Sequence, residues 1–215
     1  MGVKAFIFDM DGTLLHTLPD LAAATNEALR QKGFPERSYD EILGFMGDGG
    51  ARLIERAVPS GTSDDERWQT FDLWRSIYIG SSYHRTEPFP GVLDALRQLR
   101  ARGVKTAVLS NKFDEGTRLL ASRFFPRLFD AVRGDLPPAP RKPDPTTLLA
   151  MLGDLGVPPE EAAYVGDACV DVQVARNAGV RAIGVSWGYD ASNPLPLDQL
   201  DAYIHDPAEL LEFVS

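Results

Sequence analysis

The sequence contains very little cysteine and no long apolar run. Cys169 is its only cysteine among 215 residues, so no disulfide can form within the chain and a reducing compartment is the simpler expectation. A membrane-spanning helix needs about 18 or more consecutive apolar residues, and no run approaches that length. The N-terminus also lacks the basic segment, apolar core and small-residue cleavage site of a secretory signal. We therefore expect a cytoplasmic protein without a membrane partner.

Positive charge is scarce as well. The chain has 22 Lys and Arg against 31 Asp and Glu, and its formal net charge is −9. Nucleic acids and anionic membranes attract clustered Lys and Arg, so they are not expected as main partners. A small anionic substrate is still compatible, because one metal ion and one lysine can reverse the local field. The length favours one large domain, or one domain with an insertion.

Short apolar runs alternate with helical patterns over most of the chain. This alternation predicts an α/β fold with a parallel sheet whose strands are buried on both faces. The predicted strands are Lys4–Phe8, Val104–Leu109, Ala131–Arg133, Ala163–Val165, Ala182–Val185 and Tyr203–Ile204. The helices predicted between them are Gly91–Arg102, Pro145–Leu155 and Val170–Ala178.

Residues 16–83 interrupt the alternation with helices alone. The helices predicted there are Leu21–Lys32, Tyr39–Phe45, Ala51–Ala57 and Asp65–Tyr78. Several helices without an intervening strand indicate a separate lid or cap inserted into a core of residues 1–15 and 84–215. The alternative is that these helices pack on the sheet as ordinary crossovers.

The first predicted strand ends in two carboxylates. Asp9 follows the apolar run directly, and Asp11 comes two residues later, before a turn at Gly12 and Thr13. Charge at the end of a buried strand costs several kcal/mol unless cations or hydrogen-bond donors lie nearby. Paired carboxylates suit Mg²⁺, and Asp can act as a nucleophile in phosphoryl transfer. The alternative is a polar turn with Asp as a local cap, because Asp-Gly is common in turns.

Polar side chains also follow the other predicted strands. The carboxyl ends of parallel strands meet at one edge of a sheet, where ligands bind. Ser110 and Asn111 can equally cap the next helix, and Lys142 can be a solvated loop charge, although two flanking prolines would help to aim it. The residues that we expect at this edge are Asp9, Asp11, Ser110, Asn111, Lys112, Arg141, Lys142, Asp167 and Asp171.

Together these residues resemble the four motifs of the haloacid dehalogenase superfamily of phosphohydrolases. The first motif, Asp-x-Asp-Gly-Thr, is matched at 9–13, and the second, a Ser or Thr at a strand end, at Ser110. The third, Lys-Pro-x-Pro, is matched at 142–145, and the fourth, Gly-Asp followed by another Asp, at 166–171. The resemblance covers nearly the whole chain. It implies an α/β fold with a Rossmann-like parallel-sheet core and a helical cap inserted after the first strand.

The resemblance also implies a role for each matched residue. Asp9 would attack phosphorus and form an aspartyl-phosphate, while Asp11 would protonate the leaving alcohol and then activate water. Mg²⁺ would lie between the Asp9 carboxylate, the Asp11 carbonyl and Asp167, with Asp171 orienting its neighbours or Lys142. The phosphate-binding residues implied are Gly12, Thr13, Ser110, Asn111 and Lys142.

Within the superfamily the sequence is most similar to phosphoglycolate-phosphatase-like enzymes. The similarity lies in 11–35, in the segment GFMGDGGARL at 44–53, and in SNK and KPDPTTLL. Gly47, Asp48 and Gly49 would either face the substrate as a backbone nest or form a simple helix–helix turn. One departure is His16-Thr17, where many relatives carry Asp-Ser. Histidine serves both structural and catalytic roles, so either remains open for His16.

These features predict a Mg²⁺-dependent phosphatase acting on a small phosphorylated metabolite, with 2-phosphoglycolate favoured. The alternatives are a sugar phosphomutase, a pyrophosphatase or nucleotidase of the same superfamily, and a non-catalytic phosphate-binding regulator. The sequence allows a monomer or a homodimer, because no heptad seam or long apolar stripe is present.

Overall fold

The computed structural model describes residues 2–81, 83–189 and 194–214. The chain divides into two compact units, one comprising Met1–His16 and Pro88–Ser215 and the other Thr17–Glu87. The sequence predicted an insertion over residues 16–83 between two parts of a core. The division of the structure follows the same order of segments.

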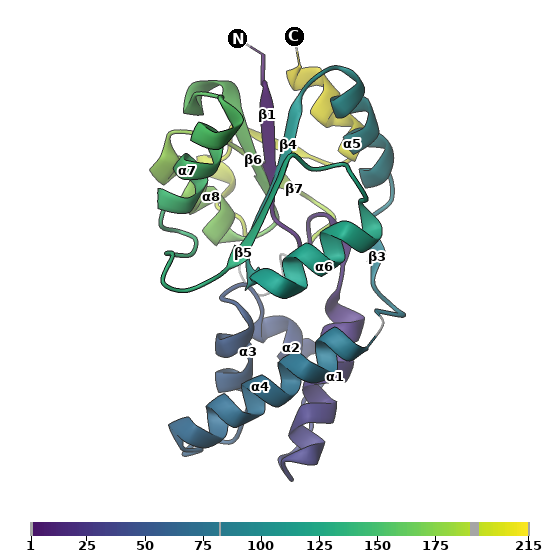
Figure 1. Cartoon of the computed structure of the whole chain (residues 1–215), viewed down its shortest axis with the longest axis vertical. Helices are drawn as coiled ribbons and strands as arrows, with labels where there is room; N and C mark the ends of the chain where they lie inside the picture. The colour runs from purple at the N-terminus through teal and green to yellow at the C-terminus, as the bar shows by residue number, and fades with distance from the viewer. Residues whose placement is uncertain (1, 82, 190–193, 215) are drawn as a thin grey trace. The chain divides into compact units, whose positions relative to one another are not determined.

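A six-stranded sheet forms the centre of the first unit (Figure 1), with the order β5-β4-β1-β6-β7-β8. Every neighbouring pair of these strands is parallel. The strands are β1 (Ala5–Phe8), β4 (Lys105–Phe113), β5 (Ala131–Asp135), β6 (Ala162–Gly166), β7 (Arg181–Val185) and β8 (Ala202–Ile204). The predicted α/β fold with a Rossmann-like parallel sheet is confirmed.

The position of β1 explains why its sequence is continuously apolar. It pairs with β4 on one side and β6 on the other, with Phe8 opposite both Val108 and Val165. All four of its residues are buried, as in strands covered on both faces. The chain order runs outward from β1 to β5 on one side and from β6 to β8 on the other. The strand order therefore reverses beside β1, the place where open parallel sheets bind ligands.

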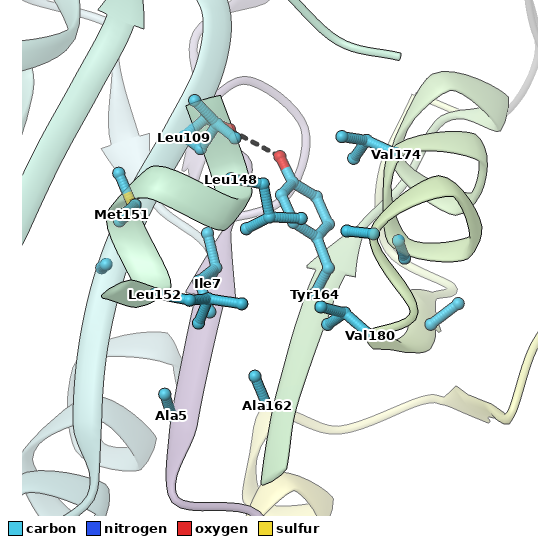
Figure 2. Close-up of a cluster of buried hydrophobic side chains, with 14 of the residues drawn as sticks. Ala5, Ile7, Leu109, Leu148, Met151, Leu152, Ala162, Tyr164, Val174 and Val180 are labelled. Atoms are coloured by element: carbon cyan, nitrogen blue, oxygen red, sulfur yellow. Dashed lines mark hydrogen bonds between the residues drawn. The ribbon is translucent and has the colours of Figure 1, made fainter. Parts of the chain in front are cut away.

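Helices cover both faces of the sheet because successive strand residues point to opposite sides. Ala5 and Ile7 lie with α7 (Thr146–Leu155) and α8 (Cys169–Ala178) in one buried cluster, which includes Leu148 and Tyr164 (Figure 2). Phe8 belongs to the other face, where it lines a small cavity with residues of α5 (Val92–Ala101) and η4 (Pro207–Phe213).

The remaining elements of this unit are short or lie at its connections. The helix α6 (Asp114–Phe124) follows β4 directly and was not predicted from the sequence. Two-residue strands β2 (Leu15–His16) and β3 (Glu87–Pro88) pair with each other where the chain leaves and re-enters the unit. Besides η4, the described residues of this unit form the 3₁₀ segments η1 (Pro159–Glu161) and η3 (Leu197–Gln199).

The second unit is built from helices α1 (Leu18–Gln31), α2 (Tyr39–Phe45), α3 (Gly50–Ala57) and α4 (Asp64–Gly80). Ser38 and Ser63 begin α2 and α4 with capping boxes, closed by Glu41 and Glu66, which satisfy amide groups that a helix start leaves free. Every helix in the described residues is too short or too polar to cross a lipid bilayer.

Strand β4 is longer than the sequence predicted. It extends to Phe113, so Ser110, Asn111 and Lys112 belong to the strand rather than to a turn after it. Its pairing with β5 shifts register between Leu109 and Phe113. The apolar pattern ends at Leu109, and the buried polar residues beyond it hid the end of the strand from a hydropathy-based prediction.

Candidate active site

The chain turns sharply where β1 ends. The Asp9 amide donates to the Val165 carbonyl at 3.0 Å, which keeps Asp9 aligned with β6. The amides of Leu14 and Leu15 both donate to the Met10 carbonyl at 3.0 Å, so the loop closes on itself. Gly12 has φ +85°, a conformation that favours glycine. Asp9 and Asp11 therefore lie in this turn at the carboxyl end of β1, at the edge of the sheet.

Lys142 is the cationic centre of this edge. Its Nζ lies 2.6 Å from Asp171 Oδ1, 3.0 Å from Asp9 Oδ1 and 2.9 Å from the Tyr164 hydroxyl. The lysine side chain is only 1 % exposed. Tyr164 in turn donates to the Leu109 carbonyl at 2.5 Å, the dashed line in Figure 2. Side chains from the end of β1, from β6 and from α8 thus converge on one ammonium group.

The surroundings of Lys142 keep it charged. Burial alone would lower its pKa, but the adjacent carboxylates of Asp171 and Asp9 raise the pKa well above the ordinary lysine value. Burial raises the pKa of Asp171 to about 6, against the opposing effect of Lys142. The second Asp171 oxygen accepts from the Ala168 amide at 3.0 Å at the start of α8. Both oxygens of Asp171 are therefore engaged by the protein itself.

Asp167 lies after β6 and is held by neutral donors. Thr13 Oγ1 donates to its Oδ1 at 2.7 Å, and the Tyr189 amide donates to its Oδ2 at 2.8 Å. Burial, with smaller contributions from Asp171 and Asp9, raises the pKa of Asp167 to about 8. A Cβ at position 12 would overlap the Asp167 carboxylate, so the space beside Gly12 is needed for this side chain. Asp167 is therefore a buried carboxyl group that contacts no cation within residues 2–81, 83–189 and 194–214.

Ser110 and Asn111 lie buried in β4, one strand away from Asp9. The Ser110 hydroxyl accepts from the Lys112 amide at 3.3 Å, and Asn111 Nδ2 donates to the Lys142 carbonyl at 3.2 Å. The alternative that they cap the next helix is wrong. Helix α6 begins at Asp114 with Phe113 at its cap position and no side-chain cap.

The sequence placed Lys112 at this edge without assigning it a role and did not single out Tyr164, yet both contact other site residues. Lys112 Nζ lies 3.1 Å from both carboxylate oxygens of Asp11, and Tyr164 contacts Lys142 as described above. The adjacency of Lys112 to Ser110 and Asn111 was a usable signal. Nothing in the sequence indicated that the Tyr164 hydroxyl reaches across to Lys142.

The oxygen atoms at this edge fit a hard divalent cation. Asp9, Asp167 and Asp171 each offer an oxygen, and these atoms lie within 4.8 Å of one another. Among the described residues no hydrogen bond reaches the buried Asp9 Oδ1, so its contact with Lys142 is an ion pair only. The four carboxyl groups of Asp9, Asp11, Asp167 and Asp171 share two lysines, so the acidic groups outnumber the cations that contact them in the described residues. Oxygen donors with uncompensated negative charge are what Mg²⁺ prefers.

The remaining predicted residues are placed differently. His16 Nδ1 lies 2.9 Å from the Tyr189 hydroxyl in a hydrogen bond, which links it indirectly to Asp167 through the Tyr189 backbone. Arg141 lies 3.9 Å from Asp135 on the surface rather than among the carboxylates. Gly47, Asp48 and Gly49 lie in the second unit between α2 and α3, where Asp48 pairs with Arg56.

The chain matches known proteins over nearly its full length. Residues 6–185 match the family model described as haloacid dehalogenase-like hydrolase. A phosphoglycolate phosphatase of Pseudomonas putida is 34% identical over 223 residues, covering 97% of this chain and 78% of the relative. A phosphoglycolate phosphatase of Vibrio parahaemolyticus is 30% identical over 229 residues, covering 99% and 96%.

Solved structures agree with these matches. A crystal structure from Haemophilus somnus, described as a predicted phosphoglycolate phosphatase, has a TM-score of 0.91 at 28% identity and covers 98% of this chain and 97% of that one. The family resemblance drawn from the four motifs is confirmed by these independent comparisons. The chain belongs to the haloacid dehalogenase-like hydrolase family.

Proposed function

We propose that this protein is a Mg²⁺-dependent phosphatase that hydrolyses a small phosphomonoester, with 2-phosphoglycolate as the favoured substrate. The observation that carries the proposal is the state of Asp9, a buried carboxylate at the end of a strand. Its Oδ1 lies 3.0 Å from Lys142 Nζ and accepts no hydrogen bond from the described residues. Relatives named phosphoglycolate phosphatase, at 34% and 30% identity, support the choice of substrate.

Asp9 is assigned the nucleophilic attack. One of its oxygens forms a bond to phosphorus while the bond between phosphorus and the leaving alcohol oxygen breaks. Lys142, with Ser110 and the Asn111 amide, binds the phosphoryl oxygens and stabilises their charge in the transition state. The carboxylate of Asp171, 2.6 Å from Lys142 Nζ, orients that ammonium group.

Asp11 is assigned both proton transfers. It gives a proton to the departing alcohol oxygen, which leaves Asp11 ionised and Asp9 phosphorylated. Asp11 then takes a proton from the water that attacks the phosphorus of the aspartyl-phosphate, which releases inorganic phosphate and regenerates Asp9. For both proton transfers the Asp11 carboxyl group must lie near the phosphoryl group. It must also leave the path between Asp9 and the phosphorus atom open.

Asp9, Asp167 and the Asp11 carbonyl are the groups proposed to hold the metal. A bound Mg²⁺ would neutralise charge on the transferring phosphoryl group. Gly12 and Thr13 support this arrangement, since Gly12 leaves space for Asp167 and Thr13 donates to it. Substrate selection by Gly47, Asp48 and Gly49 in the second unit is part of the proposal.

Phosphate release from a panel of substrates tests the function. The panel contains 2-phosphoglycolate, hexose phosphates, nucleoside monophosphates and pyrophosphate, each with Mg²⁺ and with EDTA. We expect preferred turnover of 2-phosphoglycolate that EDTA abolishes. Preference for another compound would change the substrate, and no turnover of any compound would favour a phosphate-binding regulator.

The variant Asp9→Asn tests the mechanism, with Asp94→Asn on the exposed surface of α5 as its matched control. Removing a nucleophile lowers turnover by about a thousandfold or more, whereas the control should retain the wild-type rate. Turnover that survives Asp9→Asn would refute the aspartyl-phosphate mechanism. A phosphorylated intermediate trapped by rapid quenching should be present in wild type and absent from Asp9→Asn.

A further inference from the structure

Lys112 is a buried charged residue beside the proposed site for which the mechanism above has no use. Its side chain is 3 % exposed, and its Nζ lies 3.1 Å from Asp11 Oδ1 and 3.1 Å from Asp11 Oδ2. Asp11 is more accessible, with a side chain 16 % exposed. The lysine therefore lies behind the carboxylate, and the carboxylate is the member of the pair that a substrate can reach.

Contact with both oxygens restricts the orientation of the carboxylate. A single hydrogen bond leaves a carboxylate free to rotate about the bond that joins it to Cβ, whereas one cation in contact with both oxygens opposes that rotation. Asp11 also belongs to the closed turn that begins at Met10, so its backbone is held as well. The turn thus holds the backbone of Asp11, and Lys112 restricts the last torsion angle of its side chain.

The backbone of β4 directs Lys112 to this position. The β4–β5 pairing shifts register between Leu109 and Phe113, and such irregularities redirect side chains next to active sites. The Lys112 amide donates to the Ser110 hydroxyl at 3.3 Å, which holds the irregular segment. The same three residues therefore present Ser110 and Lys112 to the same edge of the sheet.

Stability alone does not explain the pair. Burying an ammonium group carries a large desolvation cost, and an apolar residue of similar size is often as stable or more stable at such a position. The exposed Lys105 at the start of the same strand pairs with Asp130 at 3.3 Å without that cost. A buried lysine on the one carboxylate assigned to proton transfer indicates a role in the reaction.

We propose that Lys112 is a positioning residue that holds the Asp11 carboxyl group in the orientation required for proton transfer to and from the substrate oxygens. The inference rests on the proposed function, since it assumes that Asp11 exchanges protons with the leaving alcohol and with water. It assigns Lys112 no contact with the substrate. Its effect should therefore depend on how much the leaving group needs a proton.

The test compares Lys112→Met, Lys112→Arg and the control Lys105→Met on three substrates. 2-Phosphoglycolate and glycerol 2-phosphate have alcohol leaving groups that need protonation, whereas p-nitrophenyl phosphate has a leaving group that departs without it. For Lys112→Met we expect the rate of aspartyl-phosphate formation, followed by rapid quenching, to fall about 100-fold on both alkyl phosphates, with KM changed less than about threefold. On p-nitrophenyl phosphate the fall should be several times smaller. Lys112→Arg should recover part of the lost rate, and Lys105→Met should match wild type.

A double-mutant cycle isolates the coupling. In the Asp11→Asn background, Lys112→Met should cause little further loss, because the group that Lys112 positions is already absent. Losses that simply add would overturn the proposal.

The other outcomes are equally decisive. An equal fall in the rate of aspartyl-phosphate formation on all three substrates would indicate a structural role, and a raised KM for 2-phosphoglycolate alone would indicate that Lys112 binds the substrate carboxylate. A rise in kcat would mean that Lys112 holds Asp11 in an unproductive orientation. Each of these results overturns the proposal while the wild-type enzyme still turns over its substrates. Absence of turnover by the wild-type protein would instead refute the proposed function, and the inference with it.

Discussion

Among the described residues the buried ion pairs lie in the first unit, which also carries exposed ones. In the second unit the pairs Arg30–Glu27, Arg52–Glu55 and Arg56–Asp48 lie on the surface, with both partners substantially exposed. In the first unit Lys142 and Asp171 are almost completely buried, and so is Lys112 beside Asp11. Exposed pairs add little stability, whereas buried ones are costly unless fully satisfied. The difference therefore distinguishes exposed charges, which are solvated by water at the surface, from buried charges, which lie at the site that we propose for the reaction.

One buried carboxylate of the second unit sharpens the contrast. Asp20 is 5 % exposed and accepts from the Arg85 amide at 3.1 Å and from Thr86 Oγ1 at 2.7 Å. It joins the beginning of α1 to the segment that leaves the unit. Asp167 has a similar pair of neutral donors, but two further carboxylates lie beside it within reach of one metal ion. Burial of a carboxylate alone is thus not the mark of the site. The candidate site is distinguished instead by several buried carboxylates that lie close together with too few cations beside them.

Removal of Lys142 should have the largest effect on the first unit. Lys142→Met leaves Asp9 and Asp171 buried without their cation, and breaking a buried ion pair from one side costs about 3–5 kcal/mol. We expect a loss of that size in the free energy of unfolding, measured with urea in EDTA, together with loss of phosphatase activity. Lys105→Met, which removes a half-exposed lysine from the same sheet, is the control. Equal stability of the two variants would contradict the contrast between buried and exposed pairs.

The pH dependence of stability tests the excess of carboxylates. The pKa of Asp167 is raised from 3.8 to about 8 and that of Asp171 to about 6, so between these values and 3.8 the folded protein holds protons that the unfolded chain releases. The contribution of these two groups to stability therefore falls as pH rises from about 4 to about 8. The raised pKa of Lys142 leaves this slope unchanged, because the lysine stays charged in both states across that range.

Thermal unfolding midpoints across this pH range check the prediction. In EDTA the midpoint should decrease with rising pH, and Mg²⁺ should oppose the decrease because it binds the ionised carboxylates. Asp167→Asn in EDTA should show a shallower slope than wild type. A wild-type midpoint that rises through the same range would show that the buried carboxylates are compensated in some other way.

The sequence predicted the elements that a local hydropathy pattern determines. It missed features that depend on how distant segments pair and pack. The apolar run before Asp9 predicted β1 because every residue of a central strand is buried. The order of strand ends predicted that Lys142 and Asp171 would lie at the same edge of the sheet. The helix α6 was missed because Asp114 follows the polar end of β4 without a turn residue. The contact of Lys112 with Asp11 depends on the irregular pairing of β4, which leaves no trace in the hydropathy pattern.

Tyr164→Phe should have a smaller effect than loss of Lys142. The substitution keeps the ring in the cluster shown in Figure 2 but removes the hydroxyl that bonds to Lys142 and to the Leu109 carbonyl. Loss of a buried hydrogen-bonding group costs about 1–3 kcal/mol, measurable by urea unfolding. Tyr203→Phe on β8 is the matched control, since in the described part of the chain its hydroxyl has no hydrogen bond. Equal losses in the two variants would mean that the buried hydrogen bonds of the Tyr164 hydroxyl add no stability.

The smallest effect is expected in the second unit. Arg52→Ala removes the exposed pair with Glu55 on α3, and because both side chains are well solvated, the unfolding midpoint should stay within experimental error of wild type at low and at high salt. Phosphatase activity should also stay unchanged. A loss of stability as large as that of Tyr164→Phe would mean that exposed pairs hold these helices together. Burial would then no longer distinguish the ion pairs that serve the reaction from those that serve the fold.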